Sequence, residues 1–160
     1  GHMAVKAGKL VIDALNDILT AELTGINQYF LHAKMLGHMG YKRLAAKLRE
    51  ESIDEMKHAD QLIERILYLD GLPNLQKLGR IRIGETVPEM FASDIVLEQE
   101  AIPRLNAAIA LCVEQADNGT RHLLEEILVS EEAHLDWIET QQGLIQQLGL
   151  PQYLSQQLQD

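Results

Sequence analysis

Apolar residues recur every three or four positions along most of the chain, the spacing that gathers them on one face of an α-helix. Residues with high helix propensity dominate, and the strict alternation typical of strands is scarce. Clusters of glycine and proline divide the pattern into four long segments and one short segment. The chain is therefore predicted to be all-α, with helices over residues of about 8–37, 42–70, 88–116, 120–147 and 152–158.

Several helix ends carry recognisable signals. Gly71 followed by Pro73 is typical of a helix that has just ended. The sequence Thr-Val-Pro-Glu at 86–89 is typical of a capping box that starts a helix with proline in its first turn. Residues 117–119, Asp-Asn-Gly, predict the turn between the third and fourth helices, and residues 149–151 a break before the last.

The lengths of the connections predict how the helices pack. Short turns join the first helix to the second and the third to the fourth, so each pair forms an antiparallel hairpin. The connection over residues 71–86 is much longer, and its roughly 16 residues can reach about 50 Å when extended. A helix of about 30 residues is roughly 45 Å long. The predicted fold is a four-helix bundle in which one long crossover leaves the second and third helices parallel.

Length, charge and cysteine content exclude several classes of protein. Its 160 residues suit one domain, over 4–160, after a Gly-His-Met start that resembles a cloning remnant at 1–3. The net charge of −10 argues against nucleic acid as a partner. No apolar run approaches the ~20 residues of a membrane span, and no leader is recognisable, which predicts a cytoplasmic protein. Cys112 is the only cysteine, which excludes an internal disulfide.

A motif of glutamate and histidine occurs twice. In each copy a glutamate is followed 33 residues later by Glu-x-x-His. The first copy consists of Glu22, Glu55 and His58, and the second of Glu98, Glu131 and His134.

All six residues lie on the apolar faces that a bundle turns inward. One such motif is common by chance, but two copies at one interval are not. Because isolated buried carboxylates are costly, and two divalent cations would neutralise four of them, the pattern predicts a dimetal site. Carboxylate and imidazole ligands favour iron or manganese over copper or structural zinc.

The chain resembles the bacterioferritins over nearly its whole length. The strings that carry the resemblance are residues 22–32, 51–60, 64–67, 71–75 and 131–137. The resemblance implies a ferritin-like bundle, a hollow cage of 24 chains, and a di-iron ferroxidase centre in each chain. It implies the six residues of the repeated motif as ligands, with Glu55 and Glu131 bridging the two irons.

Other residues receive roles from the resemblance. It implies a haem b between paired chains, its iron held by Met56 from each. From the residues alone, a methionine that fills a helix or dimer contact is the favoured interpretation of Met56. Tyr29 and Trp137 would supply or relay electrons, or else be core aromatics. An inner-surface iron site is implied at Glu50 and Asp54, where relatives commonly have histidine in place of Glu50.

The leading functional hypothesis is iron storage and detoxification. Fe(II) would be oxidised by O₂ or H₂O₂ and stored as ferric mineral, then released through the haem by an iron–sulfur ferredoxin. The cage would contain this chain alone or with a second bacterioferritin subunit. One alternative is a di-iron oxidase or peroxidase without mineral, and another is a haem-binding assembly whose metal site is structural. A DNA-protecting mini-ferritin is disfavoured, because this chain carries a complete ligand set. His32, His38 and His122 are predicted to be surface or packing residues.

Overall fold

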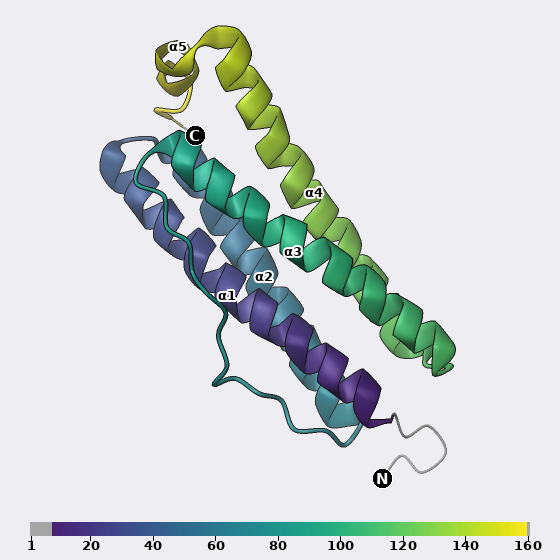
Figure 1. Cartoon of the computed structure of the whole chain (residues 1–160). Coiled ribbons are helices and arrows are strands. Elements are labelled where there is room, and N and C mark those ends of the chain that lie inside the picture. The colour runs from purple at the N-terminus through teal and green to yellow at the C-terminus, as the bar shows by residue number, and fades with distance from the viewer. Residues whose placement is uncertain (1–7, 160) are drawn as a thin grey trace.

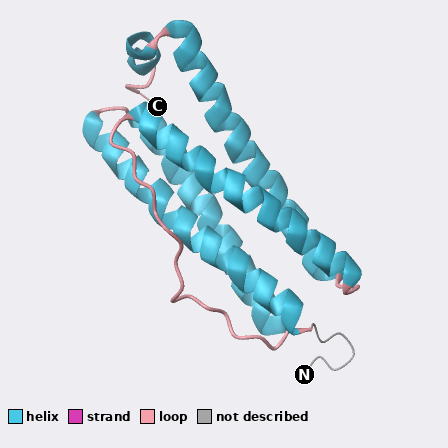
Figure 2. Ribbon diagram, viewed as in Figure 1, coloured by secondary structure: helices cyan, strands magenta, loops and turns pink. Residues whose placement is uncertain are grey.

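The computed structural model describes residues 8–159, and within them it contains helices and no strand. Four long helices lie side by side as a bundle, and a short fifth folds across one end (Figures 1 and 2). This confirms the predicted all-α class; the Gly-His-Met start at 1–3 lies outside the described residues. The helices are α1 (Lys9–Met39), α2 (Lys42–Tyr68), α3 (Val87–Glu114), α4 (Asn118–Leu148) and α5 (Leu150–Ser155).

The long crossover has the predicted path. Residues 69–86 leave α2 at the end of the bundle where α1 begins, run alongside α1, and enter α3 at the opposite end (Figure 1). As a result α2 and α3 run parallel, while α1–α2 and α3–α4 are antiparallel hairpins. The predicted capping box starts α3, since Thr86 Oγ1 accepts a hydrogen bond from the Glu89 backbone N–H at 3.3 Å.

Two predicted boundaries were wrong, each for a local reason. The turn before α4 lies earlier than residues 117–119: the chain reverses at Ala116, which has φ 55°. Asp117 then caps α4 by accepting a hydrogen bond from the Thr120 N–H at 3.1 Å, so Asn118 is already helical. The last helix begins at Leu150 instead of 152, because Pro151 fits the first turn, where its missing N–H costs nothing.

The core consists of two apolar clusters at the two ends of the bundle. The first includes Leu15, Ile18, Leu62, Ile66 and Leu124, all at most 1% exposed. The second gathers around Tyr29, Leu36, Leu48, Phe91 and Ile138, also at most 1% exposed. Between the two clusters, α1 and α3 each carry a buried glutamate of the motif, and α2 and α4 each carry a buried glutamate and a buried histidine. The middle of the bundle is therefore polar and closed at both ends by tightly packed apolar layers.

Polar side chains at every fourth position of α1 hold the crossover in place. They share one stripe of the helix and accept hydrogen bonds from backbone N–H groups of the crossover, which has no helix or strand of its own to satisfy them. The four bonds are Asn74 N–H to Asn16 Oδ1 (2.8 Å), Gly79 N–H to Thr24 Oγ1 (2.8 Å), Arg82 N–H to Gln28 Oε1 (3.1 Å) and Gly84 N–H to His32 Nε2 (3.0 Å).

His32 is fully buried, so of the two roles predicted for it the surface role is wrong. Its Nε2 accepts from Gly84 and its Nδ1 lies 3.0 Å from Asp94 Oδ1, so Nδ1 carries the proton and donates to Asp94. His38 and His122 are exposed, as predicted.

Among the helices of residues 8–159, none combines the length and the apolar composition that a membrane crossing requires. The cytoplasmic location stays a prediction from the sequence.

Gln28 provides a test of the crossover attachment. Replacing it with methionine keeps the volume but leaves the part-buried Arg82 N–H without its acceptor and removes one buried donor to Asp94. We expect the free energy of unfolding to fall by about 1–3 kcal/mol, measured by denaturant unfolding. The neighbouring exposed Asn27→Met should change it by less than about 0.5 kcal/mol, and equal effects in the two variants would contradict the proposed attachment.

Candidate metal centre

The six residues of the repeated motif meet in the polar middle of the bundle. α1 contributes one glutamate, α2 a glutamate and a histidine, α3 one glutamate, and α4 a glutamate and a histidine. In each Glu-x-x-His the three-residue spacing places both side chains on the inner face of the helix. Their exposed fractions are Glu22 2%, Glu55 3%, His58 9%, Glu98 1%, Glu131 1% and His134 4%.

The ligand atoms form two adjacent groups. In the first, His58 Nδ1 lies 3.4 Å from Glu22 Oε2 and 3.2 Å from Glu131 Oε1. Glu55 completes this group, and within each group one ligand atom from every residue lies within 4.8 Å of the others. These distances fit a single cation surrounded by three carboxylates and one imidazole.

The second group is built in the same way around His134. Its Nδ1 lies 3.3 Å from Glu55 Oε1, 3.8 Å from Glu98 Oε1 and 3.7 Å from Glu131 Oε2. Each group thus contains the three residues of one motif copy. Its fourth member comes from the Glu-x-x-His of the other copy, Glu131 in the first group and Glu55 in the second. Glu55 and Glu131 belong to both groups, so either carboxylate could bridge two ions.

Several buried polar atoms of the centre have no hydrogen-bond partner. Among the described residues, six buried atoms of the motif side chains have no hydrogen-bond partner: Glu22 Oε2, Glu55 Oε1, His58 Nδ1, Glu98 Oε2, Glu131 Oε1 and His134 Nδ1. A buried polar atom left without a partner costs about 1–3 kcal/mol. Because all six belong to residues of the two groups, two divalent cations would satisfy them together and would balance the four carboxylate charges.

Protons on buried glutamate and histidine side chains balance part of the negative charge of the centre. Burial, aided by the charge of Glu131, raises the pKa of Glu22 to about 8. Burial opposes protonation of the imidazoles, but Glu131 and Glu22 raise the pKa of His58 to about 9, and Glu131 and Glu98 raise that of His134 to about 12. Burial also opposes ionisation of Glu131, yet the close approach of Glu98 and of both histidines lowers its pKa. Bound cations must therefore displace protons.

Three neighbouring groups shape the centre. Asp54 Oδ2 lies 3.2 Å from His134 Nε2, which orients the ring and directs Nδ1 inward. The Tyr29 hydroxyl donates to Glu98 Oε1 at 2.5 Å. At Gly25 a methyl group would lie 3.1 Å from Glu55 Oε2, so the missing side chain leaves room for that carboxylate.

The other predicted site residues, Glu50, Asp54 and Trp137, differ in their exposure and in their contacts. Glu50 is exposed and pairs with Lys47 at 3.7 Å, and Asp54, one helical turn further along α2, contacts His134. Trp137 packs edge-on against Phe91, with ring centroids 5.9 Å apart.

Met56 points away from the centre. It is 56% exposed on the outside of α2, with Ile53 at 39% and Leu67 at 54% on the same side. These side chains form an apolar edge on the outside of α2, where the predicted packing or dimer role of Met56 would place it.

Two buried acids escaped the sequence analysis. Glu51 and Asp94 are both 0% exposed, and each lies four residues before a motif glutamate, Glu55 and Glu98 respectively. Burial raises the pKa of Glu51 to about 8, and neither of its carboxylate oxygens has a hydrogen-bond partner among the described residues. The four-residue spacing, which repeats the inward face of the helix, was the signal that could have found them.

Comparison with known proteins agrees with the geometry. The family model of the ferritin-like domain matches residues 12–148. The chain is 52% identical to a bacterioferritin of Streptomyces coelicolor over 145 residues, 91% of this chain and 87% of that protein. It is 48% identical to bacterioferritin BfrA of Mycobacterium tuberculosis over 146 residues, 91% and 92% of the two chains. A Brucella melitensis bacterioferritin is 42% identical over 149 residues, covering 93% and 92%.

Proposed function

The chain belongs to the bacterioferritins of the ferritin family, and we propose that it stores iron after oxidising Fe(II) at the centre formed by the six motif residues. The observation that carries this proposal is the pair of ligand groups joined by Glu55 and Glu131 within one chain. Two Fe(II) ions held there would each give one electron to a single O₂, which takes up two protons to form H₂O₂. With H₂O₂ as oxidant, the same two electrons and two protons yield two waters.

The surroundings of the centre support repeated loading by Fe(II). A cavity of about 240 Å³ opens beside His58, and its lining includes the acids Asp54 and Glu126, the amide of Gln61 and one cation, Lys57. Carboxylate and amide oxygens suit a divalent cation on its way to His58. The apolar clusters at the two ends of the bundle exclude water from the remaining sides, which strengthens electrostatic interactions inside.

Tyr29 is proposed to act during oxidation. It is fully buried, it donates its hydroxyl hydrogen to Glu98, and burial and the charge of Glu98 hold its pKa well above the usual value. A neutral phenol in contact with a ligand carboxylate is placed to give up an electron together with its proton. Trp137 lies three residues after His134 on α4 and contacts Phe91. We propose that it also supplies or relays electrons during oxidation.

Assembly and haem binding belong to the same proposal. The exposed methionine and its apolar neighbours on α2 would meet a second copy across a two-fold axis, where two Met56 sulfur atoms would hold the iron of a haem b. Twelve such pairs would close a 24-chain cage, from this chain alone or with a second bacterioferritin subunit. An iron–sulfur ferredoxin would then reduce the stored mineral through the haem. The inner-surface site at Glu50 and Asp54 stays a prediction.

Glutamate substitutions test the oxidation centre. Because Glu55 and Glu131 belong to both ligand groups, Glu55→Ala or Glu131→Ala should slow initial Fe(II) oxidation at least tenfold while the cage still assembles. Stopped-flow absorbance of Fe(III) and gel filtration measure the two properties. The exposed neighbour provides a matched control, so Glu132→Ala should oxidise at the parent rate. Parent rates in both bridging variants would overturn the assignment.

A second substitution separates haem binding from oxidation. Met56→Leu keeps an apolar side chain of similar size but removes the sulfur, so we expect the haem absorbance of the purified protein to disappear. The initial rate of Fe(II) oxidation should stay within twofold, since Met56 points away from the centre. Ile53→Leu, on the same exposed edge, should retain haem. Normal haem content in the Met56→Leu protein would refute the axial role.

A further inference from the structure

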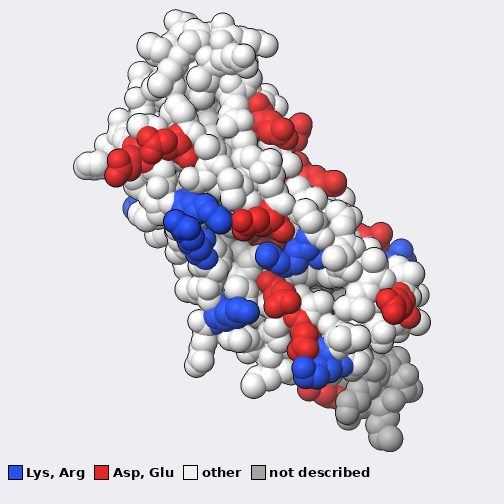
Figure 3. Space-filling model, in the orientation of Figure 1, with Lys and Arg blue, Asp and Glu red and all other residues white. Residues whose placement is uncertain are grey.

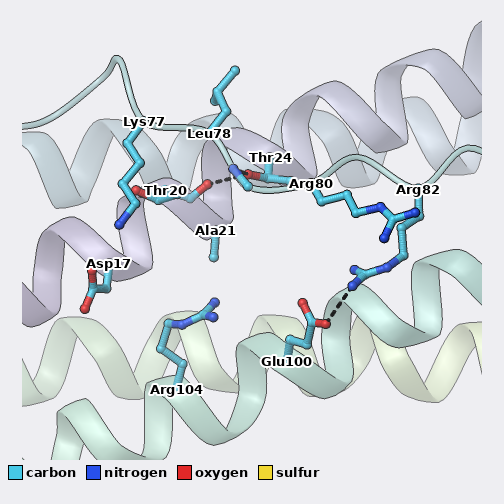
Figure 4. Close-up of a pocket in the computed structure, with 11 residues that line it drawn as sticks. Asp17, Thr20, Ala21, Thr24, Lys77, Leu78, Arg80, Arg82, Glu100 and Arg104 are labelled. Carbon is cyan, nitrogen blue, oxygen red and sulfur yellow. Dashed lines mark hydrogen bonds and ion pairs between the residues drawn. The ribbon is translucent and has the colours of Figure 1, made fainter.

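A cavity of about 410 Å³ lies on the outer surface of α1, with the crossover on one side and α3 on the other (Figure 4). Thr20, Ala21 and Thr24 of α1 form its floor, the crossover over residues 77–82 forms one wall, and α3 forms the other. None of the six motif residues lines it. It is a separate feature that the proposed oxidation reaction does not use.

Basic side chains gather around this cavity in an otherwise acidic protein. Four of the chain's 14 lysines and arginines line it, against two acids, which leaves a local charge of +2 where the whole chain carries −10. On the space-filling surface, blue atoms cluster over the middle of this face, with red atoms between and around them (Figure 3). The cations are Lys77, Arg80, Arg82 and Arg104, and the acids are Asp17 and Glu100.

Three of these four cations have no ion-pair partner among the described residues. Arg82 Nη2 pairs with Glu100 Oε1 at 3.1 Å. Within residues 8–159, by contrast, Lys77, Arg80 and Arg104 make no ion pair. Figure 4 shows Lys77 reaching down from the crossover on the side of Asp17, and Arg104 reaching up from α3 to end below Ala21. Like charges that approach one cavity without partners raise its potential, which favours an anion.

The cations of the crossover are held in position before any ligand arrives. The Gly79 N–H donates to Thr24 Oγ1 at 2.8 Å and the Arg82 N–H donates to Gln28 Oε1 at 3.1 Å. These bonds fix the backbone on both sides of Arg80 and two residues after Lys77. Binding therefore needs only side-chain ordering, which lowers the cost of association.

We propose that this cavity binds a small oxyanion with two negative charges, of the phosphate type. The planar guanidinium groups of Arg82 and Arg104 present paired N–H donors that match the oxygens of a phosphate group, and Lys77 adds a charge from above. The ligand would share Arg82 with Glu100 or take its place. The volume leaves room for a free phosphate or for the phosphate group of a small ester.

Calorimetric titration of the iron-free, assembled protein with orthophosphate tests this proposal. Without iron, phosphate has no ferric ion to bind, so the outcome does not depend on the ferroxidase. We expect saturable binding at one phosphate per chain. The double variant Arg82→Gln/Arg104→Gln should weaken it at least tenfold, and Arg49→Gln, an exposed arginine of α2 outside the cavity, should leave it unchanged.

One further variant guards against a loss of binding caused by misfolding. Glu100→Gln removes the carboxylate that occupies Arg82 and should tighten phosphate binding severalfold. Glycerol 3-phosphate binding as tightly as orthophosphate would support a phosphate ester as the cellular ligand, and orthophosphate binding alone would support the free ion. No saturable binding, or equal affinity in the double variant and the parent, would overturn the proposal.

Discussion

Four carboxylates enclosed in the apolar interior of a helical bundle are the constraint on which this structure depends. Left ionised and alone they would repel one another, and burial raises the pKa values of Glu22 and Glu98 accordingly. The two imidazoles and the protons of the cluster relieve part of this repulsion. Two divalent cations would relieve all of it, because their four positive charges equal the charge of the four carboxylates.

The fold turns a sequence repeat into a symmetric centre. Each hairpin supplies one copy of the motif, and the long crossover lets the second hairpin pack beside the first with α2 parallel to α3. That arrangement brings the first glutamate of each Glu-x-x-His between the two ligand groups. The crossover itself depends on α1, whose polar stripe accepts its backbone hydrogen bonds. One helix therefore contributes Glu22 to the centre and also fixes the segment that sets the topology.

The sequence was sufficient to predict the helices, the crossover and the six motif residues, because periodicity and spacing are local properties. Burial of all six side chains confirms the predicted inward faces. The network of Gln28, His32 and Asp94 was not predictable in this way, since its partners lie on three separate segments and its bonds exist only after packing. The start of α4 was misplaced because Asp117 was interpreted as part of a turn when its side chain caps the helix.

The same reasoning explains why the basic cavity was invisible in the sequence. Its cations are spread over residues 77–104 among acids and apolar residues, and only the docking of the crossover against α1 and α3 brings them together. The acidic opening beside His58 and this basic cavity lie on different helix pairs. Cations and anions would consequently meet the molecule at different places.

Anomalous diffraction at the iron absorption edge, from crystals soaked anaerobically in Fe(II), tests the central claim most directly. The account predicts two iron peaks within each chain, one beside His58 and one beside His134, with Glu55 and Glu131 contacting both. A single peak, or iron held only between neighbouring chains, would contradict it.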